Sequence, residues 1–282
     1  MSNIEEWIAG SNDSAIKEFR QAIHMVLVAI SNSNYLQIKM VMKGGVLLAL
    51  RFQGLRHTRD IDFSTSEQYD SDKKEKFLRT LEENILLANE LLDYGLDCRI
   101  QSSQVSPSRE DPSFPTITVK IGYAFKGTRN HKRLLEGKCP TVLRIDYSYN
   151  EISQGIDLFE FQKGRKIRAY SLSDLVGEKY RAIIQQKSRN RIRRQDAFDI
   201  YCLIKNGGLD SVGFRKLVLE SLMLKAESRG LKVDKTSLSD EEIIRRSKAE
   251  YKHLAQEIEG DLPPFNEVFH IVNEYYTSLP WI

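Results

Sequence analysis

Hydrophobic residues recur at both helical and strand spacing along the first 170 residues. Residues 13–31 predict an amphipathic helix, because apolar side chains fall on one face behind an Asp/Ser capping signal. A short apolar helix is expected over 46–52 and a longer amphipathic one over 72–92. Strand patterns cover residues 35–45, 59–65, 96–103, 115–125, 140–149, 157–161 and 166–171.

From Ser171 onward the strand patterns stop. Helical spacing then continues over 173–187, 195–206, 211–229, 240–258 and 264–277. This change predicts an α/β (α+β) protein with two domains. A mixed sheet with helices is expected over residues 1–170, and an α-helical domain over residues 171–282.

The composition favours a folded chain and limits its partners. The 282 residues are 41% hydrophobic and 29% charged, which excludes a disordered or fibrous protein. A net charge of +3 excludes binding of nucleic acid by bulk charge, so any basic surface must be local. Cys98, Cys139 and Cys202 lack the spacing of a zinc site or disulfide framework. The acidic N-terminus and the short apolar run at 25–30 predict a cytoplasmic protein with no membrane partner.

Two glycines and two aspartates form the first cluster that could carry chemistry. Lys43-Gly44-Gly45 ends one predicted strand, and Asp60-Ile61-Asp62-Phe63 follows after fourteen residues. Glycines let a backbone approach phosphates, and the next helix N-terminus offers N–H groups to an anion. Asp60 and Asp62 share a strand face, where hard oxygen ligands suit Mg²⁺ or Mn²⁺. In two-metal phosphoryl transfer such carboxylates hold the ions that bind the nucleotide. Each motif alone is also typical of a turn or a solvated face.

The combined motif resembles that of the polymerase-beta-type nucleotidyltransferase superfamily. KGGVLLALRF and RHTRDIDFS are similar to segments of the AbiEii/MenT family of toxin nucleotidyltransferases. The resemblance implies a third carboxylate on a later strand, and TVLRIDYSYNE supplies Asp146. It implies that Asp60, Asp62 and Asp146 are catalytic and bind metal, with Asp146 as third ligand or general base. An exposed polar strand face is the alternative for Asp146.

A lysine lies within a predicted apolar helix face. Ser171 and Asp174 have the spacing of a capping box, and Lys179 then aligns with Leu172, Leu175, Val176 and Ile183. Its ammonium must reach water or an anion, so it either extends past the domain edge or binds phosphate in a cleft. The resemblance favours the second, because the family places a triphosphate-binding lysine in the same Glu-Lys segment.

Asp196 lies on the inward face of the next predicted helix, in line with Asp199. Acidic residues in a first turn ordinarily complement the helix dipole, and Asp199 is expected to support its helix. RRQDAFDIYCL, however, resembles a family segment whose first aspartate belongs to the active site. The resemblance therefore implies a catalytic role for Asp196.

Two short segments could supply local positive charge. Residues 187–194 contain five cations in eight residues, and Arg191 and Arg194 are the favoured candidates for triphosphate or RNA-backbone contacts. The segment 123–133 combines cations with aromatic neighbours and suggests contact with single-stranded RNA or tRNA; its cations are Lys126, Arg129, Lys132 and Arg133. A solvated surface is the alternative for both segments.

The resemblance implies that a helical domain closes the cleft over the sheet domain. A hydroxyl or phosphate would attack the α-phosphorus of an NTP, which is held by Lys43, Gly44, Gly45, Lys179, Arg191 and Arg194, and pyrophosphate would leave. The implied role is the toxin of a bacterial toxin–antitoxin or abortive-infection pair, with tRNA or another RNA as acceptor and a cognate antitoxin as partner. Two alternatives remain open: γ-phosphoryl transfer on the same scaffold, and a non-catalytic module that binds nucleotide or RNA.

Overall fold

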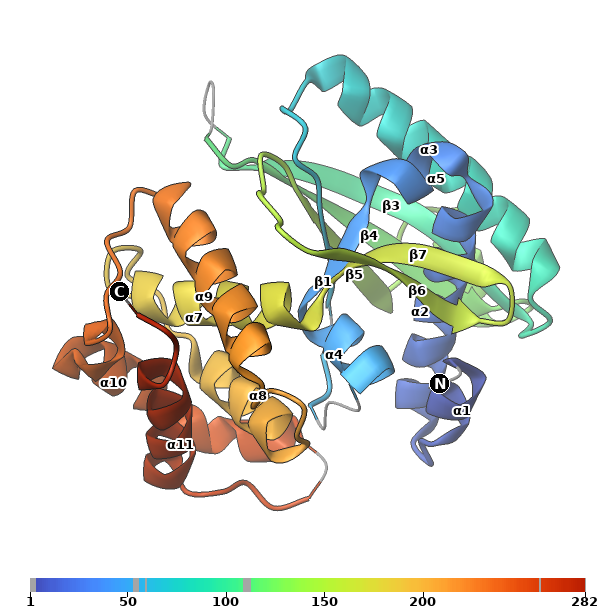
Figure 1. Ribbon diagram of the computed structural model, residues 1–282. Coiled ribbons are helices and arrows are strands. Elements are labelled where there is room, and N and C mark those ends of the chain that lie inside the picture. Colours follow the sequence, from blue (N-terminus) through green and yellow to red (C-terminus); the bar gives the residue numbers. More distant parts are fainter. Residues whose placement is uncertain (1–3, 53–55, 59, 109–112, 259, 282) are drawn as a thin grey trace. The chain divides into compact units, whose positions relative to one another are not determined.

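The computed structural model describes residues 4–52, 56–58, 60–108, 113–258 and 260–281 (Figure 1). The chain divides into two compact units. Unit 1 comprises Met1–Arg51, Thr58–Glu151 and Asp157–Ala169, and unit 2 comprises Phe52–His57, Ile152–Ile156 and Tyr170–Ile282. Two short segments that precede residue 170 in sequence therefore belong with the C-terminal helices.

Unit 1 is built on a mixed sheet with the strand order β3-β4-β5-β2-β1-β7-β6. β2 is parallel to β5 and antiparallel to β1, β4 is antiparallel to β3 and β5, and β7 is parallel to β1. The strands are β1 (Val41–Lys43), β2 (Asp60–Ser64), β3 (Leu96–Ser106), β4 (Thr116–Phe125), β5 (Val142–Ser148), β6 (Ile156–Gln162) and β7 (Arg165–Tyr170). The predicted fold class is confirmed. Arg59, where one strand was expected to begin, lies outside the described residues.

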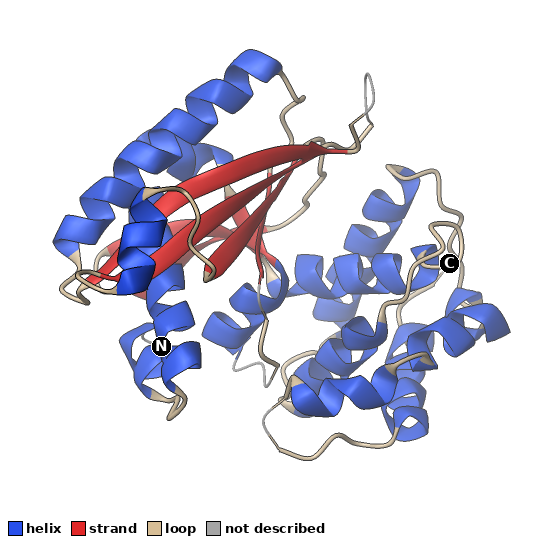
Figure 2. Cartoon of the chain, turned by 180° about the vertical axis from the view of Figure 1, so that it is seen from behind, coloured by secondary structure: helices blue, strands red, loops and turns tan. Residues whose placement is uncertain are grey.

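Helices cover the apolar face of this sheet (Figure 2). Phe77 of α5 packs on Tyr147 of β5, with ring centroids 4.8 Å apart, and α2 packs against α5. Asp13 caps α2 by accepting hydrogen bonds from the backbone of Ala15 and Ile16. The helices of unit 1 are α1 (Ile4–Ala9), α2 (Ser14–Asn32), α3 (Asn34–Lys39), α4 (Gly44–Phe52), α5 (Ser71–Leu91) and α6 (Arg129–Leu135).

The segment 35–45 differs from its prediction as one strand. Residues 34–39 form α3, and only Val41–Lys43 pair as β1. The side chain of Ser33 caps α3 by accepting a hydrogen bond from the backbone N–H of Leu36. The Ser33 cap therefore favours a helix over residues 34–39, although the apolar pattern of this segment also fits a strand.

Unit 2 is helical in its C-terminal part. It contains α7 (Leu172–Gln185), α8 (Arg194–Lys205), α9 (Val212–Glu227), α10 (Glu241–Lys248), α11 (Phe265–Thr277) and the 3₁₀ turns η1 (Ser237–Ser239) and η2 (Tyr251–Gln256). The prediction of one helix over 240–258 is wrong. Ala249 leaves the helical conformation with a ψ of 128°, and Glu250 has a left-handed φ of 58°. The chain therefore turns and buries Tyr251 and Leu254 separately.

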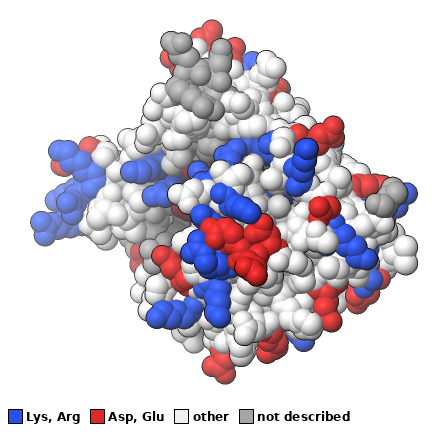
Figure 3. All heavy atoms as spheres, turned by 90° about the vertical axis from the view of Figure 1, so that its left-hand side faces the viewer, with Lys and Arg blue, Asp and Glu red and all other residues white. Residues whose placement is uncertain are grey.

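The surface carries charges of both signs. Acidic and basic side chains lie next to one another on the face drawn in Figure 3, as the totals of 42 basic and 39 acidic residues lead one to expect. Cys98 and Cys139 are buried and Cys202 is half-buried, and all three are free thiols. Of the helices that the structure describes, none is long and apolar enough to span a membrane.

Candidate functional site

Strand pairing brings the three predicted aspartates onto one face of the unit 1 sheet. Asp62 on β2 lies opposite Asp146 on β5, and Thr118 on β4 continues the same row. On the other side of Asp62 this row ends at Lys43 on β1. Asp60 lies on the same face, two residues before Asp62. Parallel pairing of β2 and β5 thus joins carboxylates that are far apart in sequence.

The two faces of these strands differ sharply in polarity. Ile61, Phe63 and Ile145 are fully buried beneath the helices, whereas Asp60, Asp62 and Asp146 are half-buried on the other face. The Thr118 hydroxyl donates a hydrogen bond of 2.7 Å to Asp146 Oδ1. This bond orients the Asp146 carboxylate on its strand.

Two cations accompany the aspartates. Arg144 Nε lies 3.9 Å from Asp60 Oδ1, and Lys43 Nζ lies 3.6 Å from Glu151 Oε1. Lys43 is buried, so its charge is held by Glu151 rather than by bulk water. On this polar face, Arg144 therefore offsets the negative charge of Asp60, and Glu151 offsets the positive charge of Lys43.

Gly44 fits the site because it has no side chain. Its φ is +74°, and a Cβ placed there would overlap Asp62 Oδ2 and lie 2.7 Å from Asp62 Cγ. Only glycine adopts this conformation without strain and leaves room for the carboxylate. Gly45 follows in the first turn of α4, so the glycine pair starts a helix.

The donor set fits a divalent cation. Asp60, Asp62 and Asp146 present carboxylate oxygens on one face of adjacent strands, and such oxygens are the ligands that Mg²⁺ prefers. Within the described ranges no three His, Cys, Asp or Glu side chains are arranged to hold a metal ion by themselves. Mg²⁺ commonly uses one or two carboxylates together with substrate phosphates, which matches this arrangement.

A second cluster of charges lies within unit 2. Lys179 of α7 donates hydrogen bonds of 3.0 Å to Asp196 Oδ1 and 2.7 Å to Asp199 Oδ2. Arg56 binds the same Asp199 through Nε at 3.2 Å and Nη2 at 3.4 Å. Lys179, Asp196 and Asp199 are all buried. The sequence predicted that the Lys179 ammonium reaches water or an anion, and in the structure two carboxylates of α8 are that anion.

Mutual attraction keeps Lys179 and Asp199 ionised. Burial opposes the charged form of Lys179, but Asp199 and Asp196 outweigh it and hold the pKa of Lys179 above its ordinary value. Burial likewise opposes ionisation of Asp199, yet Lys179 and Arg56 hold its pKa below the ordinary value. Asp196 Oδ2 is buried without a hydrogen bond among the described residues, with Arg193 Nη1 3.9 Å away.

Two members of this cluster were missed from the sequence. Asp199 was expected to support its helix, and its contacts with Lys179 and Arg56 were not predicted. Its spacing of three from Asp196, on one helix face, was the signal available. Arg56 lies 143 residues from Asp199 and has no local pattern that marks it.

The basic segment 187–194 is largely neutralised. Lys187 pairs with Asp240 at 2.7 Å, and Arg194 pairs with Glu250 at 2.8 Å and with Glu257 at 2.6 Å. Arg191 is exposed and forms no ion pair with a residue that the structure describes. Of the two favoured arginines, only Arg191 presents its charge to solvent.

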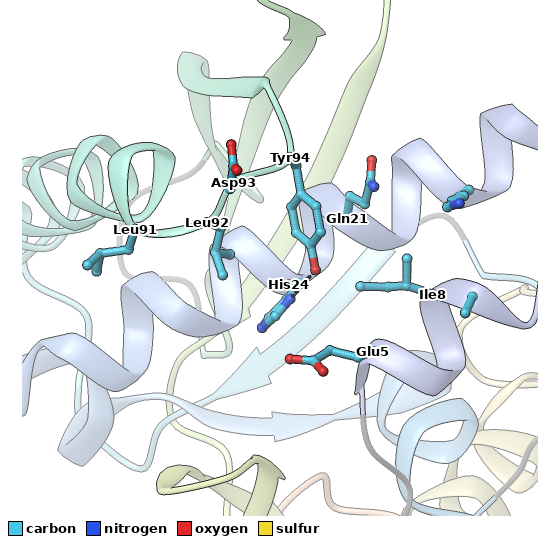
Figure 4. Close-up of a pocket in the computed structure, with 10 residues that line it drawn as sticks. Glu5, Ile8, Gln21, His24, Leu91, Leu92, Asp93 and Tyr94 are labelled. Carbon is cyan, nitrogen blue, oxygen red and sulfur yellow. Dashed lines mark hydrogen bonds between the residues drawn. The ribbon is translucent and has the colours of Figure 1, made fainter.

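A pocket of about 460 Å³ in unit 1 surrounds His24 and Tyr94 (Figure 4). The Tyr94 hydroxyl lies 2.8 Å from His24 Nδ1, and His24 Nε2 lies 3.2 Å from Gln162 Oε1. The Gln162 amide in turn donates to Glu5 at 2.9 Å. Burial lowers the pKa of His24, which favours the neutral ring. Both ring nitrogens have partners within the protein, so His24 links α2 to β6, and Gln162 extends the link to Glu5 of α1.

The chain was compared with solved structures and with known protein families. Three solved structures are similar at low identity. A protein from Helicobacter pylori described as a "putative nucleotidyltransferase" has a TM-score of 0.47 and 12% identity over 95% of this chain and 96% of that one. JHP933 from H. pylori has a TM-score of 0.43 and 15% identity over 87% and 95%. MenT4, a nucleotidyltransferase toxin from Mycobacterium tuberculosis, has a TM-score of 0.46 and 12% identity over 98% and 97%.

The family assignment comes from the sequence profile. No curated protein sequence gives a significant match. The profile of the family described as nucleotidyl transferase AbiEii toxin, type IV TA system, matches residues 26–271. This range includes the aspartates of β2 and β5 and the charged cluster of α7 and α8. The chain belongs to the AbiEii family of nucleotidyltransferase toxins.

Proposed function

We propose that this protein transfers a nucleoside monophosphate from an NTP to an RNA acceptor, with tRNA as the acceptor class, in a Mg²⁺-dependent reaction. The row of Asp62 and Asp146 on adjacent strands, with Asp60 beside it, carries the proposal. Membership of a nucleotidyltransferase toxin family supports the reaction type. A cognate antitoxin is the corresponding partner.

The aspartates have distinct roles in this proposal. Asp60 and Asp62, with Asp146, would hold the divalent cation. When bound, the cation neutralises charge on the triphosphate and polarises the α-phosphate. Thr118 occupies one oxygen of Asp146, and the other oxygen would accept the proton of the attacking hydroxyl.

The reaction forms one bond and breaks one bond at the α-phosphorus. The acceptor hydroxyl oxygen bonds to that phosphorus while its proton passes to Asp146. The bond from the α-phosphorus to the bridging oxygen breaks, and pyrophosphate leaves with the electron pair. Gly44 and Gly45 would allow the backbone at the start of α4 to approach the phosphates.

The unit 2 residues would bind the triphosphate. Lys179 has three N–H donors, of which Asp196 and Asp199 use two, so one serves a phosphate oxygen. Asp196 Oδ2 would accept a hydrogen bond from the substrate. Arg191 would add a charged contact, and Arg194 would do so if it exchanged Glu250 or Glu257 for phosphate.

Nucleotide transfer can be measured directly. Each α-³²P-labelled NTP is incubated with the purified protein, total tRNA and Mg²⁺. We expect one or more NTPs to label RNA with release of pyrophosphate. Asp62→Asn and Asp146→Asn should each lower the rate at least about 100-fold, because each removes a charge at the reacting phosphate. EDTA should abolish labelling, and added Mg²⁺ should restore it.

A serine on the same strand face provides the control. Ser148→Ala on β5 removes only the 3.1 Å hydrogen bond between Ser148 and Thr116, and its rate should stay near wild type. Label on protein instead of RNA would contradict the acceptor. Release of nucleoside diphosphate with no labelled RNA would contradict nucleotidyl transfer and support γ-phosphoryl transfer.

A further inference from the structure

We propose that the acceptor RNA runs from the aspartates across the outer face of β5 and β4 onto α6, along a series of exposed cations. Apart from Arg144, which lies 3.9 Å from Asp60, these cations form no ion pair with a residue that the structure describes. This inference rests on the proposed function and concerns the path of the RNA backbone. The cations are Arg144, Lys120, Arg129, Lys132, Arg133 and Lys138, hereafter the α6 track.

The track begins beside the aspartates. Arg144 on β5 pairs in register with Asp60 on β2 and with Lys120 on β4. Residues paired across a sheet point to the same face, so Lys120 and Arg144 extend the face that carries the aspartates. Both are exposed, and neighbouring strands lie about 4.8 Å apart, so this row spans about 10 Å.

A glycine brings α6 onto the same face. Gly122 lies two residues beyond Lys120 on β4, and a Cβ there would lie 2.7 Å from Leu134 Cδ1 of α6. Leu134 packs with Ala124 and Cys139 in a small buried cluster. Because Gly122 has no side chain, Leu134 of α6 packs directly on β4 close to Lys120.

Polar contacts fix the orientation of α6. The Thr128 side chain caps the helix by accepting a hydrogen bond from the His131 backbone N–H. His131 Nε2 lies 2.9 Å from the buried carboxylate of Asp97, which also accepts a 2.6 Å hydrogen bond from Asn89. These bonds hold one side of the helix and leave its cations on the other.

The cations of α6 are not neutralised. Residues 126–138 contain five Lys or Arg and a single acidic residue, Glu136. Lys126 pairs with Glu90 at 3.3 Å. The other four are exposed, and the structure gives them no ion pair with any residue that it describes: Arg129, Lys132, Arg133 and Lys138.

This differs from the basic segment of unit 2, which the sequence favoured. There Lys187 and Arg194 already have carboxylate partners, so binding a phosphate would require breaking ion pairs. In the α6 track, Arg144 lies 3.9 Å from Asp60, and the other five cations pair with no carboxylate that the structure describes. Phosphodiester oxygens bind exposed Lys and Arg with release of counterions, and this favours a nucleic acid backbone over a single small anion.

Charge neutralisation on α6 tests the track. The variant Arg129→Gln/Lys132→Gln/Arg133→Gln is compared with wild type for binding of fluorescent total tRNA at several KCl concentrations. We expect affinity to fall at least about tenfold at low salt, and the slope of log K against log salt to fall by about 2 to 3. Binding of NTP should be unchanged. Lys120→Gln should raise the KM for tRNA without changing the KM for NTP.

A matched control removes three charges from the other side of the sheet. Helix α5 covers the opposite face, because its Phe77 packs on Tyr147, which alternates with Asp146 along β5. The variant Lys73→Gln/Lys74→Gln/Arg79→Gln on α5 should therefore bind tRNA within about twofold of wild type. Thermal unfolding checks that both variants fold.

The outcomes separate this inference from the proposed function. If the α6 variant binds tRNA as tightly as wild type, or the α5 variant loses as much affinity, the track is wrong even if RNA is labelled. If tRNA binding depends on α6 but no NTP labels RNA, the track stands as an RNA-binding surface while the proposed function fails.

Discussion

At the scale of single residues, Gly44 gives the sharpest test of the site geometry. The backbone at this position is left-handed, and a residue with a side chain would adopt that conformation at a cost of about 1–2 kcal/mol. The side chain would also displace the Asp62 carboxylate, because its Cβ would lie 2.7 Å from Asp62 Cγ. We expect Gly44→Ala to lower the rate of RNA labelling at least about 100-fold and the free energy of unfolding by about 1–3 kcal/mol. Labelling kinetics and urea unfolding measure the two effects.

Gly164 supplies the matched control for Gly44. Its φ is +77°, but beyond its two chain neighbours no described atom lies within 4 Å of where a Cβ would stand. Gly164→Ala therefore imposes the same backbone strain without moving an aspartate, and should retain activity. Equal loss of activity in both variants would show that strain, rather than displacement of Asp62, controls the rate.

The sequence predicts some of these residue positions and not others. Strand alternation placed Asp60 and Asp62 on one face, and the parallel pairing of β2 with β5 then aligned Asp146 with them. The glycine pair was interpreted as room for phosphates, whereas the closest neighbour of Gly44 in the structure is the Asp62 carboxylate. Arg56 could not be found because its partner is set by tertiary packing, with no local signal.

At the scale of elements, the ion cluster joins α7 to α8 and to Arg56. Replacing Lys179 with Met would leave Asp196 and Asp199 buried with only Arg56 and the more distant Arg193 to balance them. We expect Lys179→Met to lower the free energy of unfolding by about 3–5 kcal/mol, the usual result of breaking a buried ion pair on one side. Chemical denaturation measures this loss, and nucleotide binding of the folded fraction reports any separate role in binding triphosphate.

A double variant separates repulsion from lost packing. Lys179→Met/Asp199→Asn removes one charge of each sign and should recover part of the stability lost in Lys179→Met. Lys216→Met on α9 removes an exposed lysine, whose side chain is 71% accessible, and should change stability by less than about 1 kcal/mol. If Lys179→Met is as stable as wild type, the cluster does not stabilise the packing of α7 on α8.

Helical periodicity explains which elements were predicted. The long amphipathic patterns gave α2, α5 and α7 to within a few residues of their observed bounds. Prediction from periodicity was wrong at 35–45, where the Ser33 cap favours a short helix. It was also wrong at 240–258, where Glu250 has a left-handed conformation. Both failures depend on single backbone conformations, which a hydrophobic period does not encode.

At the scale of the whole molecule, unit 2 depends on two segments that the predicted boundary at residue 170 would assign elsewhere. Arg56 pairs with Asp199 and with Glu257 at 3.2 and 3.9 Å, and the Ile152 carbonyl accepts a 2.9 Å hydrogen bond from Lys225. Gln154 N–H donates to the buried Asp174 at 3.2 Å. A fragment of residues 171–282 would keep the Lys225–Asp174 pair at 3.1 Å and the Lys179–Asp199 pair at 2.7 Å. It would remove one further polar partner from each of Lys225, Asp174 and Asp199.

We expect that fragment to be less stable than the same helices in the full chain, because each of these buried charges loses one of its hydrogen-bond or ion-pair partners. Amide hydrogen exchange measures this directly, and amides of α7, α8 and α9 should exchange faster in the fragment. The full chain with Arg56→Met loses only the contacts to Asp199 and Glu257, so its exchange should be intermediate. Equal protection in the fragment and the full chain would show that residues 171–282 form a self-sufficient domain and that the two segments contribute no stability to it.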